Sequence, residues 1–250
     1  GPERRRADRS GRGAVRGHRP GTDPLSPDRL QPGDGGGIGP AETHSWKSMH
    51  VVILGNGIAG VTAARNIRKR SRDARITVVS GESDHHWSRP ALMYIYMGHM
   101  RYRDTKPYED RFWTDNRIEL VRGWVQTVDV DGHALVFTDG RRLDYDKLVL
   151  ATGSTPNRWG WPGQDLDRVH GMYSLQDLVS LERMTPRLRH AVIVGGGLIG
   201  IELAEMLHSR HVPVTMLVRE ALYWNNVLPR EEAAMVVRAI ERAGIGLRLS

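Results

Sequence analysis

Residues 50–60 read HVVILGNGIAG, an apolar run followed by a turn rich in glycine. An apolar run without polar interruption is typical of a buried parallel strand. Residues 61–72 then place apolar side chains at helical spacing with basic ones elsewhere, and residues 76–79 form a second β-branched run. The order of strand, glycine-rich turn, helix and strand predicts a βαβ unit.

The glycines of this turn suit a dinucleotide. Gly55 permits the tight turn, Gly57 lets backbone approach a pyrophosphate, and Gly60 allows the helix to pack closely on the strand. The N–H groups of Ile58 and Ala59 lie at the start of the helix, where the positive end of the helix dipole favours an anion. A lone pattern of this kind is often only a flexible loop, but here it lies between a strand and a helix. We therefore assign these five residues to a cofactor site.

An acidic residue is expected after the second strand of such a unit, where it accepts hydrogen bonds from ribose hydroxyls. Glu82 stands there, two residues beyond Ser80. The alternative is a solvated turn residue. We predict that Glu82 binds the ribose.

The same pattern returns at residues 190–200, HAVIVGGGLIG, followed by a predicted helix at 201–210 and a strand at 214–218. A chance repeat in this context is improbable, so the chain is predicted to hold two dinucleotides. The second set of cofactor-binding residues is Gly195, Gly197, Leu198, Ile199 and Gly200.

The end of the second copy differs in chemistry from the first. Alignment by distance from Gly195 puts Val218 where the ribose acid is expected, with Arg219 beside it. A missing acid and an adjacent guanidinium suit a 2′-phosphate, which favours NADP over NAD. Glu220 can still reach the ribose, and Arg219 can simply face water.

Further elements follow from the pattern of apolar residues and turns. Strands are predicted at 125–130, 134–138 and 147–151, and the Gly-, Pro- and Trp-rich stretch 156–163 predicts a crossing between domains. We assign Val125 to the cofactor-binding residues. A helix is predicted from Pro229 to about Ala243, and a strand begins at Ile245.

Residues 1–48 contain 10 of the 28 glycines and 6 of the 13 prolines. Such a composition cannot bury enough apolar surface to offset the cost of ordering the backbone, so we predict a disordered head. An expression scar or an extension before Met49 explains it better than a transit peptide, because it carries six acidic residues. The head also contributes to the pI of about 10.0, so the basic charge predicts no specific nucleic-acid partner.

The chain has no cysteine, which excludes thiol nucleophiles, dithiol redox centres and cysteine metal sites. No apolar run is long enough to span a membrane, and the adjacent His85 and His86 do not complete a metal site. We predict a cytoplasmic protein without a metal, whose redox chemistry comes from a cofactor.

The two fingerprints, joined through 145–154 (YDKLVLATGS), resemble the pyridine nucleotide-disulfide oxidoreductase superfamily. The resemblance implies an α/β fold of two Rossmann-like, three-layer (ββα/βαβ) domains, the second inserted in the first. It implies that the first fingerprint binds FAD, that Ala151, Thr152 and Gly153 close the FAD domain beside the cofactor, and that the second binds NAD(P)H. We place the FAD-binding domain at 49–162 and an incomplete NAD(P)-binding domain at 163–250.

Residues 76–82 with Trp87-Ser88-Arg89 are similar to the flavin domain of nitrite reductase large subunits and of rubredoxin-type reductases. Tyr94 stands where ferredoxin-type reductases carry a lysine close to the flavin. Arg89 is our candidate for an electrostatic contact with the flavin. Glu202 matches an acid near the flavin and nicotinamide in many members of the family. The alternative interpretation is that Glu202 is simply an acidic residue on the surface of a helix. These two are the candidate catalytic residues.

The resemblance implies an NAD(P)H-dependent FAD oxidoreductase that transfers hydride from the nicotinamide to flavin N5 without a cysteine redox centre. Its acceptor is predicted to be a small molecule or an electron-carrier protein. Two alternatives stay open, a peripheral NAD(P)H:quinone reductase and a redox-regulated nucleic-acid-binding flavoprotein. The family's late Gly-Asp motif and C-terminal interface domain are not in the sequence, so we expect a fragment of a longer protein, which forms a homodimer if that domain exists.

Overall fold

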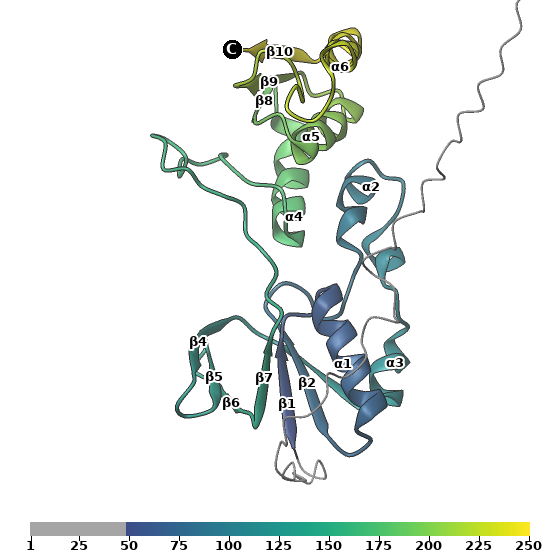
Figure 1. Cartoon of the computed structure of the whole chain (residues 1–250), viewed down its shortest axis with the longest axis vertical. Coiled ribbons are helices and arrows are strands. Elements are labelled where there is room, and N and C mark those ends of the chain that lie inside the picture. The colour runs from purple at the N-terminus through teal and green to yellow at the C-terminus, as the bar shows by residue number, and fades with distance from the viewer. Residues whose placement is uncertain (1–48) are drawn as a thin grey trace, which may run out of the picture. The chain divides into compact units, whose positions relative to one another are not determined.

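The computed structural model describes residues 49–250, so the predicted disordered head lies outside the described residues. The predicted βαβ unit is confirmed by β1 (His50–Leu54), α1 (Ile58–Arg70) and β2 (Arg75–Ser80) (Figure 1). Strand β1 lies between β2 and β7 (Lys147–Leu150), and β3 (Ile118–Arg122) pairs with β2. All three pairings are parallel, with Val51 opposite Ile76 and Leu54 opposite Val79.

Alternate residues of this sheet face different layers. Val51 and Ile53 pack with Val61 and Ala64 of α1, in a cluster that also includes Trp113 of α3 (Asp110–Asp115). On the other face, Val52 and Val79 form a cluster with residues of a three-stranded antiparallel sheet. This sheet has the order β4-β5-β6: β4 (Val125–Asp129), β5 (Ala134–Phe137) and β6 (Arg142–Asp144). The predicted three-layer arrangement is therefore confirmed for the first unit, which comprises strands β1 to β7 and the helices packed on them.

The second fingerprint forms a second parallel sheet with the order β10-β9-β8. Its elements are β8 (Ala191–Val194), α5 (Leu198–Ser209), β9 (Val214–Val218), α6 (Arg230–Arg242) and β10 (Gly246–Leu249). The repeat extends to a side-chain contact, since His50 Nε2 lies 2.8 Å from Thr77 Oγ1 and His190 Nε2 lies 3.0 Å from Thr215 Oγ1. The α/β fold with two dinucleotide-type units is confirmed.

The second sheet differs from the first in having one face open. Val192 is 58% exposed and Leu217 is 40% exposed, whereas their counterparts Val52 and Val79 are fully buried under the antiparallel sheet. Within the described residues, only the helical side of the second sheet is covered.

Several elements were not predicted. They are β3, β6, α2 (Leu92–Tyr96), α3, α4 (Leu175–Met184) and the 3₁₀ turns Arg89–Ala91, Tyr102–Thr105 and Thr185–Arg187. Most of them are shorter than two helical turns or have no apolar run, so tertiary packing decides them. No helix in residues 49–250 is long and apolar enough to cross a membrane.

The segment 87–97 belongs to the first half of the sequence but packs with the second. Trp87, Leu92 and Tyr96 lie in one buried cluster with Leu178 of α4 and Met216 of β9. The intervening residues 151–174 contain no helix or strand (Figure 1). The core of the second unit, formed by α4 and the β8–β10 sheet with its helices, is thus completed by residues from much earlier in the sequence. The contact of Tyr96 with Thr185, about 90 positions away, is an example.

Candidate dinucleotide-binding sites

The three glycines of the first turn have different surroundings. Gly55 has φ +116°, and a Cβ on it would lie 2.0 Å from the carbonyl oxygen of Ala151. A Cβ on Gly60 would lie 1.9 Å from the oxygen of Gly55, so neither position tolerates a side chain. Gly57 has an ordinary φ of −68°, and a Cβ there would meet nothing within 4 Å. Gly57 therefore leaves open space at the start of α1.

The helices that follow both turns begin without a side-chain cap. Gly57 and Gly197 are the N-cap residues of α1 and α5, and neither helix has an acid in its first turn. In contrast, α4 begins with a complete capping box between Ser174 and Asp177. The first N–H groups of α1 and α5 are thus left for an anion, whereas those of α4 have protein partners.

The second turn repeats this geometry. Gly195 has φ +121°, Gly197 has nothing within 4 Å of its Cβ position, and a Cβ on Gly200 would lie 2.5 Å from the oxygen of Gly195. The buried Tyr223 donates a 2.9 Å hydrogen bond to the carbonyl of Gly197. This bond holds the turn in place from the loop after β9.

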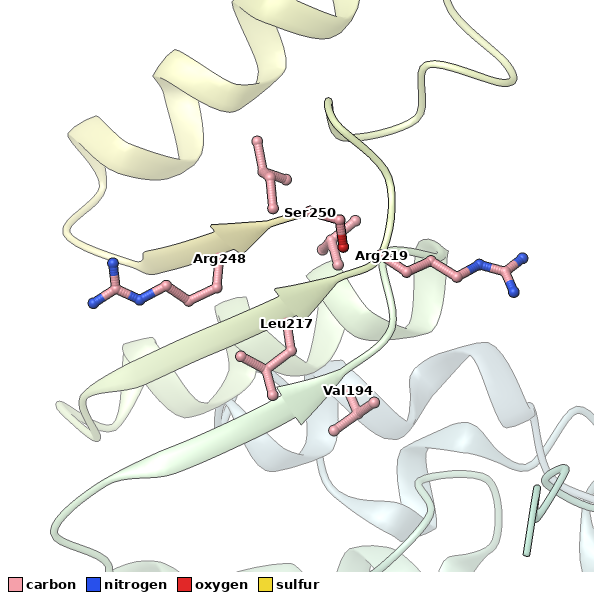
Figure 2. Close-up of a pocket in the computed structure, with 7 residues that line it drawn as sticks. Val194, Leu217, Arg219, Arg248 and Ser250 are labelled. Carbon is pink, nitrogen blue, oxygen red and sulfur yellow. The ribbon is translucent and has the colours of Figure 1, made fainter. Parts of the chain in front are cut away.

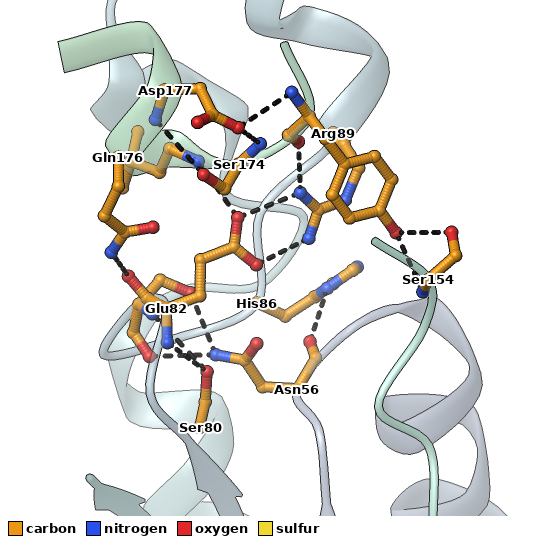
Figure 3. Close-up of polar contacts among 12 residues, drawn as sticks. Asn56, Ser80, Glu82, His86, Arg89, Ser154, Ser174, Gln176 and Asp177 are labelled. Carbon is orange, nitrogen blue, oxygen red and sulfur yellow. Dashed lines mark hydrogen bonds and ion pairs between the residues drawn. The ribbon is translucent and has the colours of Figure 1, made fainter. Parts of the chain in front are cut away.

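Hydrogen bonds with the loop after β2 hold the first turn in place. Asn56 Nδ2 donates to the carbonyl and to Oγ of Ser83, both at 3.0 Å. His86 Nδ1 donates to the carbonyl of Asn56 at 2.9 Å (Figure 3). Burial lowers the pKa of His86, which favours its neutral form. Sequence reasoning missed Asn56 and His86, because Asn56 occupies a variable position of the motif and His86 lies 30 residues away.

Glu82 and Arg89, predicted separately as cofactor residues, are brought together (Figure 3). Arg89 Nη1 donates to Glu82 Oε1 at 2.9 Å, and Nη2 donates to Oε2 at 2.5 Å. Burial alone would lower the pKa of Arg89, but the hydrogen bonds and charge of Glu82 outweigh it and raise that pKa. Glu82 Oε1 also accepts from the backbone N–H of Leu175 at 3.0 Å. A carboxylate has about four acceptor positions, so Glu82 keeps room for a further donor such as a ribose hydroxyl.

Arg89 also contacts the segment that leads into α4. Its Nη1 donates to the carbonyl of Tyr173 at 2.6 Å, and its guanidinium lies 4.4 Å from the centre of the Tyr173 ring. The Tyr173 hydroxyl lies 3.3 Å from Oγ of Ser154, directly after Gly153 of the Ala-Thr-Gly segment. Hydrogen bonds from Ser154 lower the pKa of Tyr173. The predicted residues Glu82, Arg89 and Gly153 thus gather around Tyr173.

The carboxyl ends of β8, β9 and β10 border a pocket whose lining includes Val194, Leu217, Arg219 and Arg248 (Figure 2). The two arginine side chains point in opposite directions. Arg219 is 91% exposed, and its Nε donates to Glu220 Oε1 at 3.0 Å. Its guanidinium is accessible to a phosphate.

Strand register corrects the alignment of the two copies. Leu54 pairs with Val79 and Val194 pairs with Leu217, so Val218 corresponds to Ser80. The counterpart of Glu82 is therefore Glu220, two residues later, and not Val218. A count along the sequence does not align the two copies, because Leu54 and its partner Val79 are 25 positions apart whereas Val194 and its partner Leu217 are 23 positions apart.

The remaining predicted residues lie at scattered places. Glu202 is exposed on α5, and Val125 is the half-buried first residue of β4. Thr152 is exposed after β7, whereas the carbonyl of Ala151 lies against Gly55.

The family model for pyridine nucleotide-disulphide oxidoreductases matches residues 49–250. The chain belongs to this family. It is 31% identical over 204 residues to the p-cumate 2,3-dioxygenase system ferredoxin--NAD(+) reductase component of Pseudomonas putida, covering 79% of the chain and 50% of that protein. It is 29% identical to the rubredoxin-NAD(+) reductase of Pseudomonas putida, covering 81% of the chain and 53% of that protein.

Among solved structures, this family member is similar to the NADH:rubredoxin oxidoreductase from Clostridium acetobutylicum. The TM-score is 0.71 at 25% identity, covering 81% of the chain and 53% of that structure. A ferredoxin reductase from Rhodopseudomonas palustris gives a TM-score of 0.70, covering 80% of the chain and 50% of that structure. The chain thus spans about half the length of the relatives it matches.

Proposed function

We propose that this chain is the FAD- and NAD(P)H-binding part of a flavoprotein reductase that transfers electrons to a carrier protein. The observation that carries the proposal is the pair of uncapped helix N-termini, each behind a turn whose middle glycine faces open space. A bound FAD would accept hydride from the nicotinamide and pass electrons onward. The relatives named for ferredoxin and rubredoxin support a carrier protein as the acceptor.

In this proposal the chain's own residues bind and orient. The N–H groups at the start of α1 hold the FAD pyrophosphate, Glu82 accepts from the adenosine ribose, and Arg89 fixes the Glu82 carboxylate. The N–H groups at the start of α5 hold the nicotinamide dinucleotide, and Glu202 orients the nicotinamide. The chain has no cysteine, so it supplies no dithiol to this electron transfer.

The preference between NADH and NADPH depends on two neighbouring residues. Arg219 is free to meet a 2′-phosphate, which supports the NADPH preference that the sequence favours. The strand registers make Glu220 the equivalent of Glu82, which supports binding of a ribose diol and therefore of NADH. The ratio of kcat/KM for the two nucleotides decides. If the guanidinium binds the phosphate, Arg219→Ala lowers kcat/KM for NADPH relative to NADH. If the carboxylate binds the diol, Glu220→Gln lowers kcat/KM for NADH relative to NADPH.

The experiment for the whole proposal is reconstitution of the 250-residue chain with FAD. We expect a yellow protein whose flavin absorbance bleaches when NADH or NADPH is added without oxygen. A chain that binds neither FAD nor ADP at millimolar concentration overturns the proposal. A chain that binds FAD but is reduced by neither nucleotide overturns its NAD(P)H half. A cytoplasmic location stays a prediction, which cell fractionation tests.

A further inference from the structure

Trp124 is a large apolar side chain that lies largely in solvent. It is 58% exposed, although most tryptophans in folded proteins are well buried. It stands immediately before Val125, the first residue of β4, and its carbonyl accepts from the N–H of Thr138 at 2.9 Å. The backbone at Trp124 is therefore fixed by the antiparallel sheet while the indole stays open.

Two glycines place the indole beside the loop that follows β2. The N–H of Gly123 donates to the carbonyl of Ser80 at 3.0 Å, which ties the end of the β3 segment to the end of β2. The indole lies against Gly81, where a Cβ would come within 2.3 Å of Trp124 Cδ2. Gly81 directly precedes Glu82, the residue proposed to hold the adenosine ribose. One ring face is therefore fixed next to that site.

We infer that the indole of Trp124 forms a wall of the adenine pocket and stacks on the adenine of FAD. The base is bonded to the ribose that Glu82 holds, so it lies within side-chain reach of Gly81 and Trp124. Stacking uses the flat face of a base and needs no specific hydrogen bond, which suits an exposed indole. The inference rests on the proposed FAD site and adds a residue that gives FAD its advantage over FMN, which has no adenosine.

The experiment measures ADP, FAD and FMN binding by calorimetry to the 250-residue chain and its variants, with intrinsic fluorescence as a second readout. Loss of base stacking is expected to weaken ADP and FAD binding roughly 5- to 150-fold in Trp124→Ala. Trp124→Phe is expected to keep most of the affinity, because it keeps an aromatic face. FMN binding is expected to be the same in all of them. ADP is expected to quench tryptophan fluorescence in the wild type and to quench it much less in Trp124→Phe.

Two further variants separate stacking from a structural role. Gly81→Ala keeps the indole but displaces it, because the added Cβ collides with the ring, and is expected to weaken ADP binding as well. Trp159→Ala removes another exposed indole, in the loop between 151 and 174, and is expected to bind ADP like the wild type. Urea unfolding of each variant verifies that the fold is intact.

The outcomes distinguish this inference from the proposed function. If wild-type protein binds ADP and folded Trp124→Ala binds it equally well with unchanged quenching, the role of Trp124 is wrong and the FAD site stands. If Trp124→Ala weakens FMN as much as ADP, the indole acts on the fold and not on adenine, which also overturns the inference. If the wild type binds no ADP, the FAD site fails, and the inference fails with it.

Discussion

The phenol oxygen of Tyr96 lies 2.6 Å from Oγ1 of Thr185, in a buried contact between residues 89 positions apart. Thr185 Oγ1 in turn donates to the carbonyl of Leu181 at 2.7 Å. Arg210 of the second unit donates through Nε to the carbonyl of Tyr96 at 2.8 Å. Helix α2, which follows the 3₁₀ turn Arg89–Ala91, is thus bonded to residues at the ends of α4 and α5.

Removal of the Tyr96 hydroxyl is therefore expected to destabilise the chain without changing its shape. Tyr96→Phe leaves Thr185 Oγ1 without its donor in a dry site, which costs about 1 kcal/mol. Tyr96→Ala creates a cavity and costs roughly 3 to 5 kcal/mol. The free energy of unfolding in urea measures both. Tyr94→Phe, at a neighbouring but partly exposed ring, serves as the control, and an equal loss there would contradict the role of this bond.

The glycines of the first turn are expected to separate binding from folding. Gly57→Ala has an allowed backbone and an open Cβ position, but alanine is a poorer N-cap than glycine, so the free energy of unfolding should change by no more than about 1 kcal/mol. The methyl group would occupy the path of the pyrophosphate, so FAD affinity should fall on the order of tenfold or more. Calorimetry and thermal unfolding measure the two effects.

Gly60→Ala is the matched opposite. Its Cβ would lie 1.9 Å from the oxygen of Gly55, so α1 must move away from the strand and the chain should lose stability before any ligand is added. Equal behaviour of Gly57→Ala and Gly60→Ala in the unfolding assay would refute the different roles assigned to these residues.

The ion pair of Glu82 and Arg89 is expected to contribute measurably to stability, because its side chains are only 17% and 31% exposed and the contact is bidentate. A double-mutant cycle with Glu82→Gln and Arg89→Met should give a coupling energy of about 1 to 3 kcal/mol. The pair Arg101 and Asp104 is a control of the same chemistry on the surface, where solvent screening should leave a coupling energy clearly smaller than that of Glu82 and Arg89. A cycle that finds no coupling at Glu82 and Arg89 contradicts their proposed mutual positioning.

Stability is expected to fall as the pH is lowered from about 7 to 5. Burial lowers the pKa values of His50, His85 and His86 below the ordinary value of 6.5. In this pH range the unfolded chain therefore binds more protons than the folded one, which favours unfolding. The stabilisation is complete above the unfolded pKa and is lost as the pH falls from there through the lower pKa of the folded chain.

The variant His86→Gln tests the most buried of these three histidines. The variant should show a shallower loss of unfolding free energy between pH 7 and pH 5 than the wild type, whatever its absolute stability. A wild-type stability that is flat or rises toward pH 5 would count against neutral buried histidines.

Much of the fold followed from local sequence. The apolar runs of β1, β2, β8 and β9 and the glycine turns predicted both βαβ units, because a run of this kind has few other stable environments. Strand β3 was missed because its sequence, IELVR, mixes polar and apolar residues without a clear period. Helix α4 was missed although its capping box was readable, at Ser174 and Asp177.

The candidate site was predictable only in part. The glycines, Glu82 and Arg89 were predicted as separate residues, but their spacing carries no information that a carboxylate and a guanidinium seven residues apart bond to one another. The counterpart of Glu82 in the second unit was misplaced, since the paired strand residues are two positions closer along the chain in the second copy, which strand register shows and a count from the glycine turn does not.

The sequence by itself determined the two glycine-rich turns, their flanking strands and helices, and the absence of thiol chemistry, because these depend on backbone freedom, apolar periodicity and residue type. Only the tertiary structure decided that Tyr96 belongs to the core of the second unit, that Glu82 and Arg89 form one pair, and that Trp124 lies on Gly81. These contacts join residues from different elements. They exist because burial of apolar side chains on both sheets brings distant segments together, and no local pattern encodes that closeness.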